Sequence, residues 1–385
     1  MARPADEREA RDVPEDPGVD PGSPAADAAP SLLALALKDG GRALVERVVA
    51  LGGKPFHARI LRQNVLAKGV IEYPAMTSLP AALRARLAAE LPVLSGREVE
   101  RSVAADGTTK LLLEFPRRGA RAPATVEMVH MPSLDLAEEG DLQKGATLCV
   151  STQVGCPVGC PFCASGQLGL TRNLASDEIL EQYVRGRALG PLGRSVVMGM
   201  GEPLLNYANL AEALDTVHDD IGLGSRKVTV STVGFPERLR RLAPERPRFQ
   251  LAISLHSPFQ EQRDVLVPAM KGVPIGDLLA AGDDWFEKTG REVTYEYILL
   301  GGENDTREHA TRLAELLRGR RCTVNLIPFN PVEESPYRRP RAGEVEGFQR
   351  SLVEAGIVAT VRWSRGVESD AACGQLRTRR VQRPA

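Results

Sequence analysis

The sequence predicts an α/β protein whose main domain is a partial (β/α)6 barrel of the TIM type, with a small N-terminal helical and hairpin domain. Two observations support this fold class. Six short β-rich runs alternate with helical patterns between residues 147 and 329, and a seventh run at 358–363 follows a further helix. Strands separated by helices pair in parallel, because each helix crosses one face of the sheet. A doubly wound open sheet fits the same pattern and remains the competing architecture.

The predicted strands of the main domain are short and rich in Val, Leu, Ile and Thr. They are the runs "TLCVST" (147–152), "SVVMGM" (195–200), "KVTVST" (227–232), "FQLAISL" (249–255), "EVTYEYILL" (292–300) and "TVNLIPF" (323–329). Helical periodicity occupies residues 176–190, 206–220, 236–244, 275–290 and 307–319. In either architecture the functional site is expected at the carboxyl ends of the strands.

The chain is expected to divide into three parts. Residues 1–30 contain Pro, Asp, Ala and Gly but almost no large apolar side chain. We expect a disordered tail there, because so little apolar surface cannot offset the entropy of ordering. Residues 31–132 are expected to form a compact accessory domain, and residues 133–385 form the main domain.

The accessory domain combines both kinds of periodicity. Residues 31–52 and 79–91 have the spacing of amphipathic helices. Two strand-like runs follow, "KLLLEFP" at 110–116 and "ATVEMVHM" at 124–131, separated by a basic turn. The sequence therefore predicts a helical module followed by a β-hairpin.

Composition and charge limit the function classes. The 385 residues are 43% hydrophobic, and 49 Lys and Arg face 50 Asp and Glu, so the formal net charge is −1. A global basic field is absent, and any nucleic-acid binding must come from local clusters such as Arg117–Arg121, Arg338–Arg341 or the tail at Arg377, Arg379 and Arg380. No run of 18 apolar residues exists, and the acidic, Pro-rich start does not resemble a secretory signal. We expect a cytoplasmic protein without a membrane anchor.

Six cysteines are present, and four of them lie within fifteen residues. This distribution favours metal-binding or catalytic thiols in a reducing compartment over a disulfide framework. Cys156, Cys160 and Cys163 are spaced C-x3-C-x2-C on a predicted loop just after a strand. A structural zinc site usually closes with four ligands, whereas three thiolates on a 4Fe-4S cluster leave one iron open.

The stretch "GCPVGCPFCASG", with Phe162 before the last cysteine, resembles the radical S-adenosylmethionine (SAM) superfamily. The resemblance implies that the open iron is chelated by the amino and carboxylate groups of SAM. It also implies that Gly201 and Glu202, in "GEP" after the second strand, contact the methionine moiety. Other polar or strand-end residues expected at the same rim are Ser231, Ser254, Leu255, His256 and Asn330. Taken singly, each of these serines would more simply be a strand-end turn residue.

Motifs spread from residue 31 to residue 376 resemble the RlmN/Cfr family, radical enzymes that methylate a carbon of an adenosine in 23S ribosomal RNA. They are "TLCVSTQVGC", "TRNL", "MGMGEPLLNY", "LAISLHSP", "VNLIPFNP" and "DAACGQL", together with "GKPFHARIL" in the accessory domain. The resemblance implies that the accessory domain binds RNA and that the main domain ends in a catalytic segment. It further implies an electron donor such as flavodoxin or ferredoxin, and we expect a monomer.

The same resemblance assigns roles to two further cysteines and a glutamate. Cys373 accepts a methyl group from one SAM molecule, and a second SAM is cleaved to a radical that takes a hydrogen from the methylated Cys373. The carbon radical then adds to adenine, since the electron-poor C2 position does not attack a sulfonium methyl group. Glu127 matches the position of the proton acceptor. Cys149 attacks the bridging sulfur and leaves a Cys149–Cys373 disulfide.

Several departures and alternatives remain. The linker after Glu127 is longer than usual for the family and carries Glu138 and Glu139, which makes the position of Glu127 less secure. Val233 stands where many relatives have serine. RlmN-type relatives methylate C2, some also on transfer RNA, and Cfr-type relatives methylate C8; we favour C2.

Two alternative functions other than RNA methylation also remain. One is a non-catalytic RNA-binding protein stabilised by a metal, and another is a radical enzyme that acts on a small molecule or a protein. Cys322 is read as a buried residue at a strand start.

Overall fold

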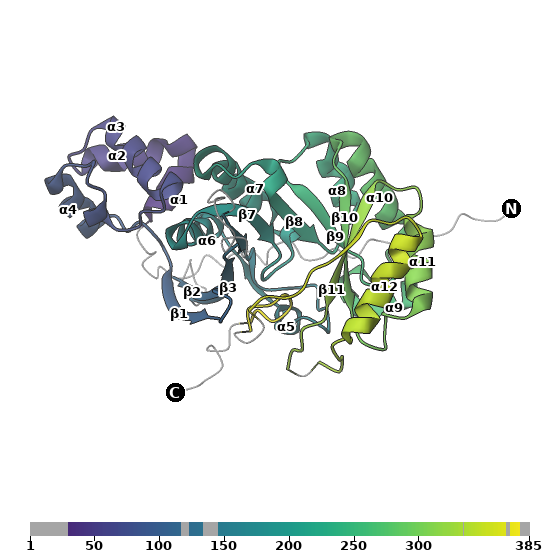
Figure 1. The fold of residues 1–385 in the computed structure, drawn as a ribbon. Coiled ribbons are helices and arrows are strands. Elements are labelled where there is room, and N and C mark those ends of the chain that lie inside the picture. Colours follow the sequence, from purple (N-terminus) through teal and green to yellow (C-terminus); the bar gives the residue numbers. More distant parts are fainter. Residues whose placement is uncertain (1–29, 117–122, 134–144, 334, 367–369, 378–385) are drawn as a thin grey trace, which may run out of the picture.

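The computed structural model describes residues 30–116, 123–133, 145–333, 335–366 and 370–377. It shows a curved ten-stranded sheet with a group of four helices beyond one end (Figure 1). The predicted α/β class, with helices and a hairpin at the N-terminal side, is confirmed. The expected disordered tail falls almost entirely outside the described residues.

Seven consecutive parallel strands form the main part of the sheet. They are β4 (Ala146–Cys149), β7 (Leu192–Val197), β8 (Val228–Thr232), β9 (Gln250–Ser254), β10 (Val293–Leu299), β11 (Cys322–Pro328) and β12 (Ala359–Val361). Each strand pairs with the next one in this series. A doubly wound sheet would reverse its order at a switch point, so the order identifies the barrel-type architecture. The sheet runs from β1 to β12 and is open, as a partial barrel requires.

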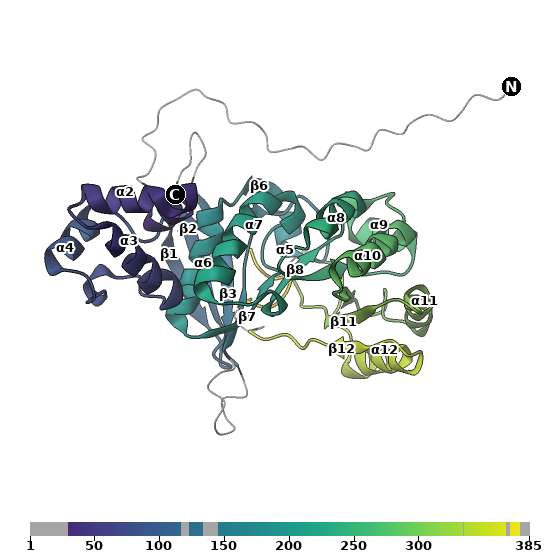
Figure 2. The same cartoon turned by 90° about the horizontal axis from the view of Figure 1, so that it is seen from above.

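The connecting helices lie along the outer, convex side of the curved sheet (Figure 2). They are α6 (Ser176–Leu189), α7 (Tyr207–Thr216), α8 (Pro236–Leu242), α9 (Gln260–Leu266), α10 (Ile275–Thr289), α11 (Arg307–Leu317) and α12 (Ala342–Glu354). Five of them were predicted within a few residues, α12 was predicted without bounds as the helix before the last strand, and α9 was not predicted. Its seven residues, "QEQRDVL", are too few for the periodicity of an amphipathic helix to be read.

The accessory helices are α1 (Leu32–Leu37), α2 (Arg42–Ala50), α3 (Pro55–Arg62) and α4 (Ala81–Glu90). The helical pattern over 31–52 is interrupted at Asp39, Gly40 and Gly41, all of which have positive φ angles. Such a left-handed stretch ends one helix and starts the next in a new direction. The two short helices thereby bury Leu32, Leu33, Leu44 and Val48 in one core.

The predicted hairpin consists of β2 (Thr109–Phe115) and β3 (Ala124–Met131), which pair antiparallel. A third strand, β1 (Arg97–Val103), pairs with β2 and was not predicted. Its sequence "REVERSV" is largely exposed and lacks the apolar alternation that marks a half-buried strand. On its other side β3 pairs with β4, so the hairpin continues the parallel sheet without a break.

Shorter helical turns connect these elements. Among the described residues, six are 3-10 turns and two are π turns that extend α3 and α7. The 3-10 turns are Lys38–Gly41, Tyr73–Ala75, Pro203–Leu205, Ser225–Lys227, Ala243–Glu245 and Pro268–Met270. The π turns are Gln63–Ala67 and Val217–Ile221. The turn at Pro203–Leu205 directly follows β7 and shapes the rim of the sheet.

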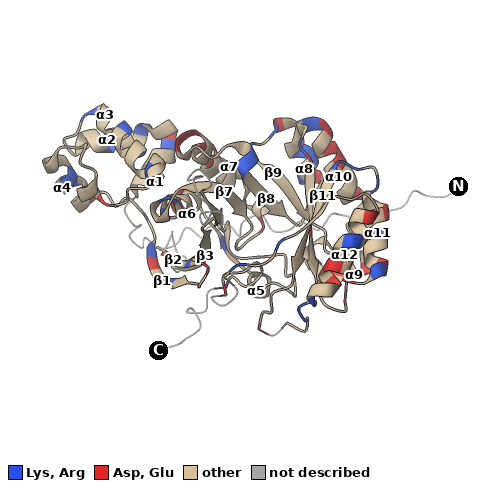
Figure 3. Cartoon of the chain, viewed as in Figure 1, with Lys and Arg blue, Asp and Glu red and all other residues tan. Residues whose placement is uncertain are grey.

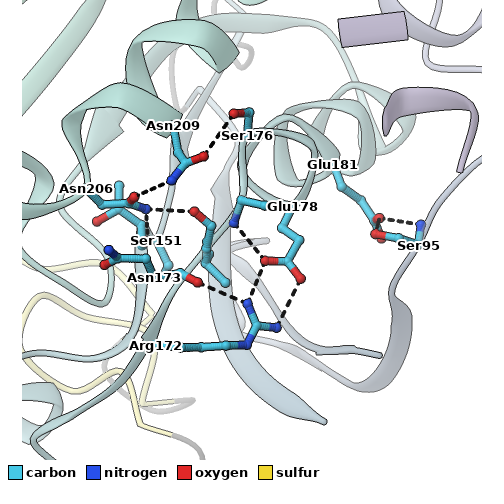
Figure 4. A network of polar contacts seen from close by, with 12 residues as sticks. Ser95, Ser151, Arg172, Asn173, Ser176, Glu178, Glu181, Asn206 and Asn209 are labelled. Atoms are coloured by element: carbon cyan, nitrogen blue, oxygen red, sulfur yellow. Dashed lines mark hydrogen bonds and ion pairs between the residues drawn. The ribbon is translucent and has the colours of Figure 1, made fainter. Parts of the chain in front are cut away.

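Helix α6 is buried along most of its length and carries a polar network (Figure 4). Glu178 accepts two hydrogen bonds from the guanidinium of Arg172, at 2.8 and 3.0 Å, and one from the backbone of Ala175. Asn206 donates to the carbonyl oxygens of Thr152 and Leu174. Because buried charges and amides are costly unless they are paired, this network fixes the chain on both sides of the loop after β4.

No helix among the described residues is long and apolar enough to cross a membrane.

Candidate active site

The three clustered cysteines lie on a loop at the carboxyl end of β4. A two-stranded ribbon of β5 (Gln153–Gly155) and β6 (Leu170–Asn173) forms the base of this loop. Gly155 has φ +76°, and a Cβ added there would lie 1.8 Å from the carbonyl oxygen of Gly169. Only glycine therefore fits where the loop leaves the ribbon. Cys156 follows at once, and its backbone N–H donates to the same carbonyl at 2.9 Å.

The loop closes at a short helix, α5 (Ala164–Gln167), for which Cys163 is the N-cap residue. The N–H of Cys163 donates to the carbonyl of Cys160 at 3.1 Å. Backbone N–H groups are also directed at the sulfurs, from Val158 and Gly201 to Cys156. Gly166 provides the same contact for Cys163. Hydrogen bonds of this kind stabilise the thiolate form of a ligand.

Burial is the largest influence on all three thiols and raises the pKa of Cys156, Cys160 and Cys163. The charge of Cys163 also raises the pKa of Cys156 and Cys160. Cys156 and Cys163 pack against the apolar cluster that contains Cys160. Three buried thiolates need a positive partner, which an iron-sulfur cluster supplies. Among the described residues, no three His, Cys, Asp or Glu side chains converge on a single ion. A 4Fe-4S cluster takes each cysteine on a separate iron and does not need that convergence.

A buried arginine beneath the loop also fits a negatively charged group. Arg263, on α9, has no exposed surface, and its Nη2 donates to the carbonyl of Val233 at 2.9 Å. Its Nε and Nη1 have no hydrogen-bond partner among the described residues. Burial lowers the pKa of Arg263 to about 10, and the thiol of Cys160 acts in the opposite direction. A buried cation beside a thiolate-ligated cluster would offset part of its negative charge.

His256 and Phe162 link the loop to the end of β9. The rings meet edge to face with centroids 5.0 Å apart. The Nδ1 atom of His256 accepts a hydrogen bond from the N–H of Ile298 at 3.1 Å. Burial lowers the pKa of His256 to about 3, so the ring is neutral at pH 7 and its proton is on Nε2. The predicted site residue is thus a neutral hydrogen-bond donor through Nε2.

In the Gly-Glu-Pro segment after β7, the backbone passes close to neighbouring residues. Gly201 has φ +104°, and a Cβ added there would lie 2.6 Å from the side chain of Gln153. The carboxylate of Glu202 accepts hydrogen bonds from the hydroxyl of Thr232 at 2.6 Å and from the N–H groups of Leu204 and Val233 at 3.0 and 2.9 Å. A carboxylate accepts about four such bonds, so one position remains for a ligand donor.

Val233 contributes through its backbone. Its side chain packs in the apolar cluster that includes Cys160 and Phe162, while its N–H binds Glu202. The missing serine hydroxyl at this position therefore leaves the strand-end hydrogen bond intact.

The remaining predicted rim residues differ in what they offer a ligand. Ser231 on β8 and Ser254 at the end of β9 are half-buried. Leu255 is fully buried, and its N–H donates to Glu296 while its carbonyl accepts from Ser257. These residues occupy the carboxyl ends of neighbouring strands, as expected for one polar rim. Whether each of them contacts SAM stays a prediction.

Cys149 and Cys373, far apart in sequence, line the same cavity of about 220 Å³. Met198, Arg362 and Arg365 also line it. Burial, and then the charge of Cys373, raise the pKa of Cys149 to about 12, and Arg362 lowers it. Both cysteines are free thiols. The tertiary structure therefore brings together the two sulfurs that the proposed chemistry requires.

The segment that carries Cys373 lies against the cysteine loop. Asn330, another predicted site residue, donates to the carbonyl of Cys373 at 3.1 Å. The N–H of Ala164 donates to the carbonyl of Gly374 at 2.8 Å, and the hydroxyl of Ser165 donates to that of Leu376 at 2.7 Å. Helix α5, which begins at the last cluster cysteine, therefore positions Cys373 as well.

Glu127 lies on β3 and is buried. Its Oε1 is 3.0 Å from Nζ of Lys110, and its Oε2 accepts the N–H of Arg377 at 2.7 Å. Burial raises the pKa of Glu127, and Lys110 opposes this shift. Because Val129 is paired with Cys149, Glu127 lies two residues further along β3 on the same face as Cys149. Sheet register determines this position, whereas most of the longer linker, including Glu138 and Glu139, lies outside the described residues.

Charge on the described surface is mixed. Figure 3 shows basic and acidic residues interleaved along the outer helices, while the parallel strands contain few charged residues. Of the candidate RNA-contacting arginines, Arg338 is paired with Glu344 and Arg377 with Glu333. Arg117–Arg121 and the tail at Arg379 and Arg380 lie outside the described residues. Cys322 begins β11 as predicted but is half-buried rather than buried.

Sequence reasoning missed three charged residues of this site: Lys110, Arg263 and Arg362. Each is a basic residue inside or beside an otherwise apolar run, in "KLLLEF", "RDVLV" and "TVRW". That isolation was the available signal, since a charge flanked by core residues is either paired or functional.

Comparisons with known proteins agree with the geometry. The model of the radical SAM superfamily matches residues 150–314. The chain is 45% identical over 347 residues to the probable dual-specificity RNA methyltransferase RlmN of Synechococcus sp. (strain CC9311), covering 88% of this chain and 96% of the relative. It is 42% identical over 329 residues to the protein so described from Nostoc punctiforme, covering 84% and 88%.

A solved structure is similar over nearly its whole length. The crystal structure of a radical SAM methyltransferase from Sphaerobacter thermophilus superimposes with a TM-score of 0.78 at 41% sequence identity, covering 90% of this chain and 99% of that one. The similarity includes both the accessory helices and the main sheet, because the shared region is too long for either part alone.

Proposed function

The chain belongs to the RlmN family of radical SAM RNA methyltransferases, and on that premise we propose that it methylates C2 of an adenosine in 23S ribosomal RNA, with transfer RNA as a second substrate. Enzymes of this family use a 4Fe-4S cluster and SAM. The preference for C2 over C8 rests on relatives described as RlmN, and their description as dual-specificity enzymes supports the second substrate.

We assign the cofactor sites as follows. Cys156, Cys160 and Cys163 hold the cluster, whose chemistry with SAM is one-electron hydrogen abstraction. The residues assigned to SAM are Gly201, Glu202, Ser231, Ser254, Leu255, His256 and Asn330. The remaining acceptor position of Glu202 suits the ammonium group of a methionine moiety, and burial of that carboxylate strengthens the contact.

Three residues of the chain perform the transfer. The Cys373 thiolate takes a methyl group from SAM and forms a thioether, which later links Cys373 to the adenosine carbon. Glu127 removes the ring proton from that carbon. The Cys149 thiolate then attacks the sulfur of Cys373, and the bond from this sulfur to the methylene carbon breaks. The methylene carbon keeps the electron pair and takes up a proton from solvent, so that a disulfide and methyladenosine result. The common cavity of Cys149 and Cys373 is the single observation that carries this assignment.

The partners and location follow from the same chemistry. An electron donor such as flavodoxin or ferredoxin would reduce the cluster, and RNA would reach the cavity from the side of the accessory domain. We also propose a monomer that acts in the cytoplasm, where thiols stay reduced.

The test is anaerobic incubation of the iron-loaded protein with a 23S ribosomal RNA fragment, SAM and a reductant, followed by mass spectrometry of the nucleosides. We expect 2-methyladenosine, its loss in Cys373→Ala, and its retention in Cys322→Ala, which removes a thiol outside the site. 8-Methyladenosine would overturn the regiochemistry. Neither product from ribosomal or transfer RNA, with iron bound, would overturn RNA methylation.

A further inference from the structure

The segment 370–377, which carries Cys373, is attached to the antiparallel edge of the sheet through one ion pair. Lys110 on β2 places its Nζ 3.0 Å from Oε1 of Glu127 and 3.2 Å from the carbonyl oxygen of Asp370. The other carboxylate oxygen of Glu127 accepts the N–H of Arg377 at 2.7 Å. The pair therefore binds the first and last residues of the segment at the same time.

This attachment depends on charge. The side chains of Lys110 and Glu127 are only 15% and 6% exposed, so solvent screens them little. A hydrogen bond to an ionised acceptor is roughly twice as strong as a neutral one. Neutralising Glu127 would weaken both the ion pair with Lys110 and the bond from Arg377.

The attachments of the middle of the segment do not titrate. The carbonyl oxygens of Cys373, Gly374 and Leu376 accept bonds from Asn330, Ala164 and Ser165, respectively. None of these donors changes charge between pH 5 and 9. The middle of the segment is thus held independently of pH, whereas its two ends depend on charged groups, which are Lys110 with Glu127 and, on the exposed side, the ion pair of Arg377 with Glu333.

Charged and titratable groups approach Glu127 from three sides. Lys110 comes from β2, Asp370 and Arg377 belong to the segment, and Cys149 lies on the same face from β4. Burial and Asp370 raise the pKa of Glu127, whereas Lys110 and the Arg377 N–H lower it. These opposed influences make proton uptake responsive to what occupies the neighbouring cavity.

We propose that Lys110 and Glu127 form a proton-controlled latch on the Cys373 segment, with Lys110 as a positioning residue. The inference rests on the proposed function, in which Glu127 takes the ring proton. That proton converts the carboxylate to a neutral acid, both ends of the segment loosen, and Cys373 turns toward Cys149. Return of the proton to solvent restores the latch. The disulfide thereby forms only after Glu127 has removed the ring proton.

Hydrogen exchange tests the latch without RNA. In the anaerobic, iron-loaded protein, mass spectrometry follows exchange in the peptide covering residues 370–377. Glu127→Gln mimics the protonated acid, and we expect at least tenfold faster exchange there. Lys110→Met should have the same effect, and Lys110→Arg should restore most of the protection. Glu114→Gln, on the same strand as Lys110 and paired with exposed Arg97, is the matched control and should change nothing.

The pH dependence of exchange distinguishes a proton-controlled latch from an attachment that is only structural. After correction for intrinsic exchange, protection of the wild-type peptide should fall as pH falls through the pKa of Glu127, and Glu127→Gln should abolish this dependence. Exchange in Glu127→Gln within twofold of the wild type, or an unchanged pH dependence, would overturn the latch. This readout is independent of methylation, so a wild-type protein that protects the segment but yields no methyladenosine would refute the proposed function alone.

Discussion

The cysteine loop and the Cys373 segment lie side by side, yet they are held in different ways. The loop over residues 155–166 has backbone constraints close in sequence, which are left-handed glycines, a two-stranded ribbon and a helix cap. The segment over 370–377 belongs to no helix or strand. It is held by donors from β2, α5 and the loop after β11 and by an acceptor on β3. A locally constrained loop suits a permanent cofactor, whereas a segment held by distant side chains is able to move during a reaction.

The largest effects should come from replacing one cysteine by alanine in each of the two regions. Cys160→Ala removes a cluster ligand, so iron and methylation should both be lost. Cys373→Ala should retain full iron content while methylation falls at least a thousandfold, because the methyl acceptor is gone. Iron analysis and nucleoside mass spectrometry measure both. Loss of iron in Cys373→Ala would mean that the two regions are a single metal site.

Cys149→Ala should separate resolution of the adduct from the earlier steps at the cluster and at Cys373. The adduct between Cys373 and RNA would form but not resolve, so a covalent complex should accumulate. Gel electrophoresis under denaturing conditions detects it. A variant that turns over normally would remove Cys149 from the mechanism.

Backbone constraint in the loop can be tested at two glycines with similar φ angles. Gly155→Ala brings Cβ against the carbonyl of Gly169, whereas Gly159→Ala, at φ +74°, meets open space. We expect Gly155→Ala to cost about 3–5 kcal/mol and to reduce iron loading, from left-handed strain plus the steric clash. Gly159→Ala should cost only about 1–2 kcal/mol. Urea unfolding and iron content are the measurements, and equal costs would refute the steric argument.

The strands beneath both regions carry a buried carboxyl whose charge state affects stability. Burial raises the pKa of Glu296 to about 7, against the opposing influence of Arg362. The folded state thus favours the neutral acid, and this contribution is present below the ordinary pKa of 4.5 and lost as pH rises through about 7. Glu296→Gln keeps an acceptor for Asn325, so it should be up to about 3 kcal/mol more stable than the wild type at pH 8.

At pH 5 the gain from Glu296→Gln should be much smaller. Urea unfolding at both pH values measures the difference. The control is Glu315→Gln, at an exposed residue of α11 that is paired with Arg312. It should change the free energy of unfolding by similar amounts at the two pH values. A pH-independent gain for Glu296→Gln would exclude titration as its cause.

The smallest predicted effect concerns the packing of the Cys373 segment. Gln375 donates to the carbonyl of Pro331 at 3.0 Å and accepts the N–H of Ala372. Gln375→Ala should cost about 1 kcal/mol and slow methylation severalfold, with unchanged iron content. Gln349 on α12 donates a similar bond to the carbonyl of Ala359 on β12, so Gln349→Ala should destabilise comparably without slowing methylation. Equal rates for the two variants would show that the segment tolerates misplacement.

The predicted elements differed in how much local signal they carried. Strand β10, "VTYEYIL", and helix α10 are long and strongly patterned, and both were predicted nearly to their ends. Strand β1 was missed because its charged residues leave no apolar face, and α9 because it is too short for a period to show. Both form because neighbours hold them, which local pattern does not encode.

The sequence by itself determined the fold class, the alternation of strands and helices and the cysteine spacing of the loop, because these depend on periodicity and on residues close together in the chain. Only the tertiary structure decided that Cys149 and Cys373 share a cavity and that Glu127 meets Lys110 and Arg377. It also decided that Arg263 is buried within electrostatic reach of Cys160, with two guanidinium nitrogens that have no hydrogen-bond partner among the described residues. Contacts between residues hundreds of positions apart depend on sheet register and packing, which no short stretch of sequence specifies.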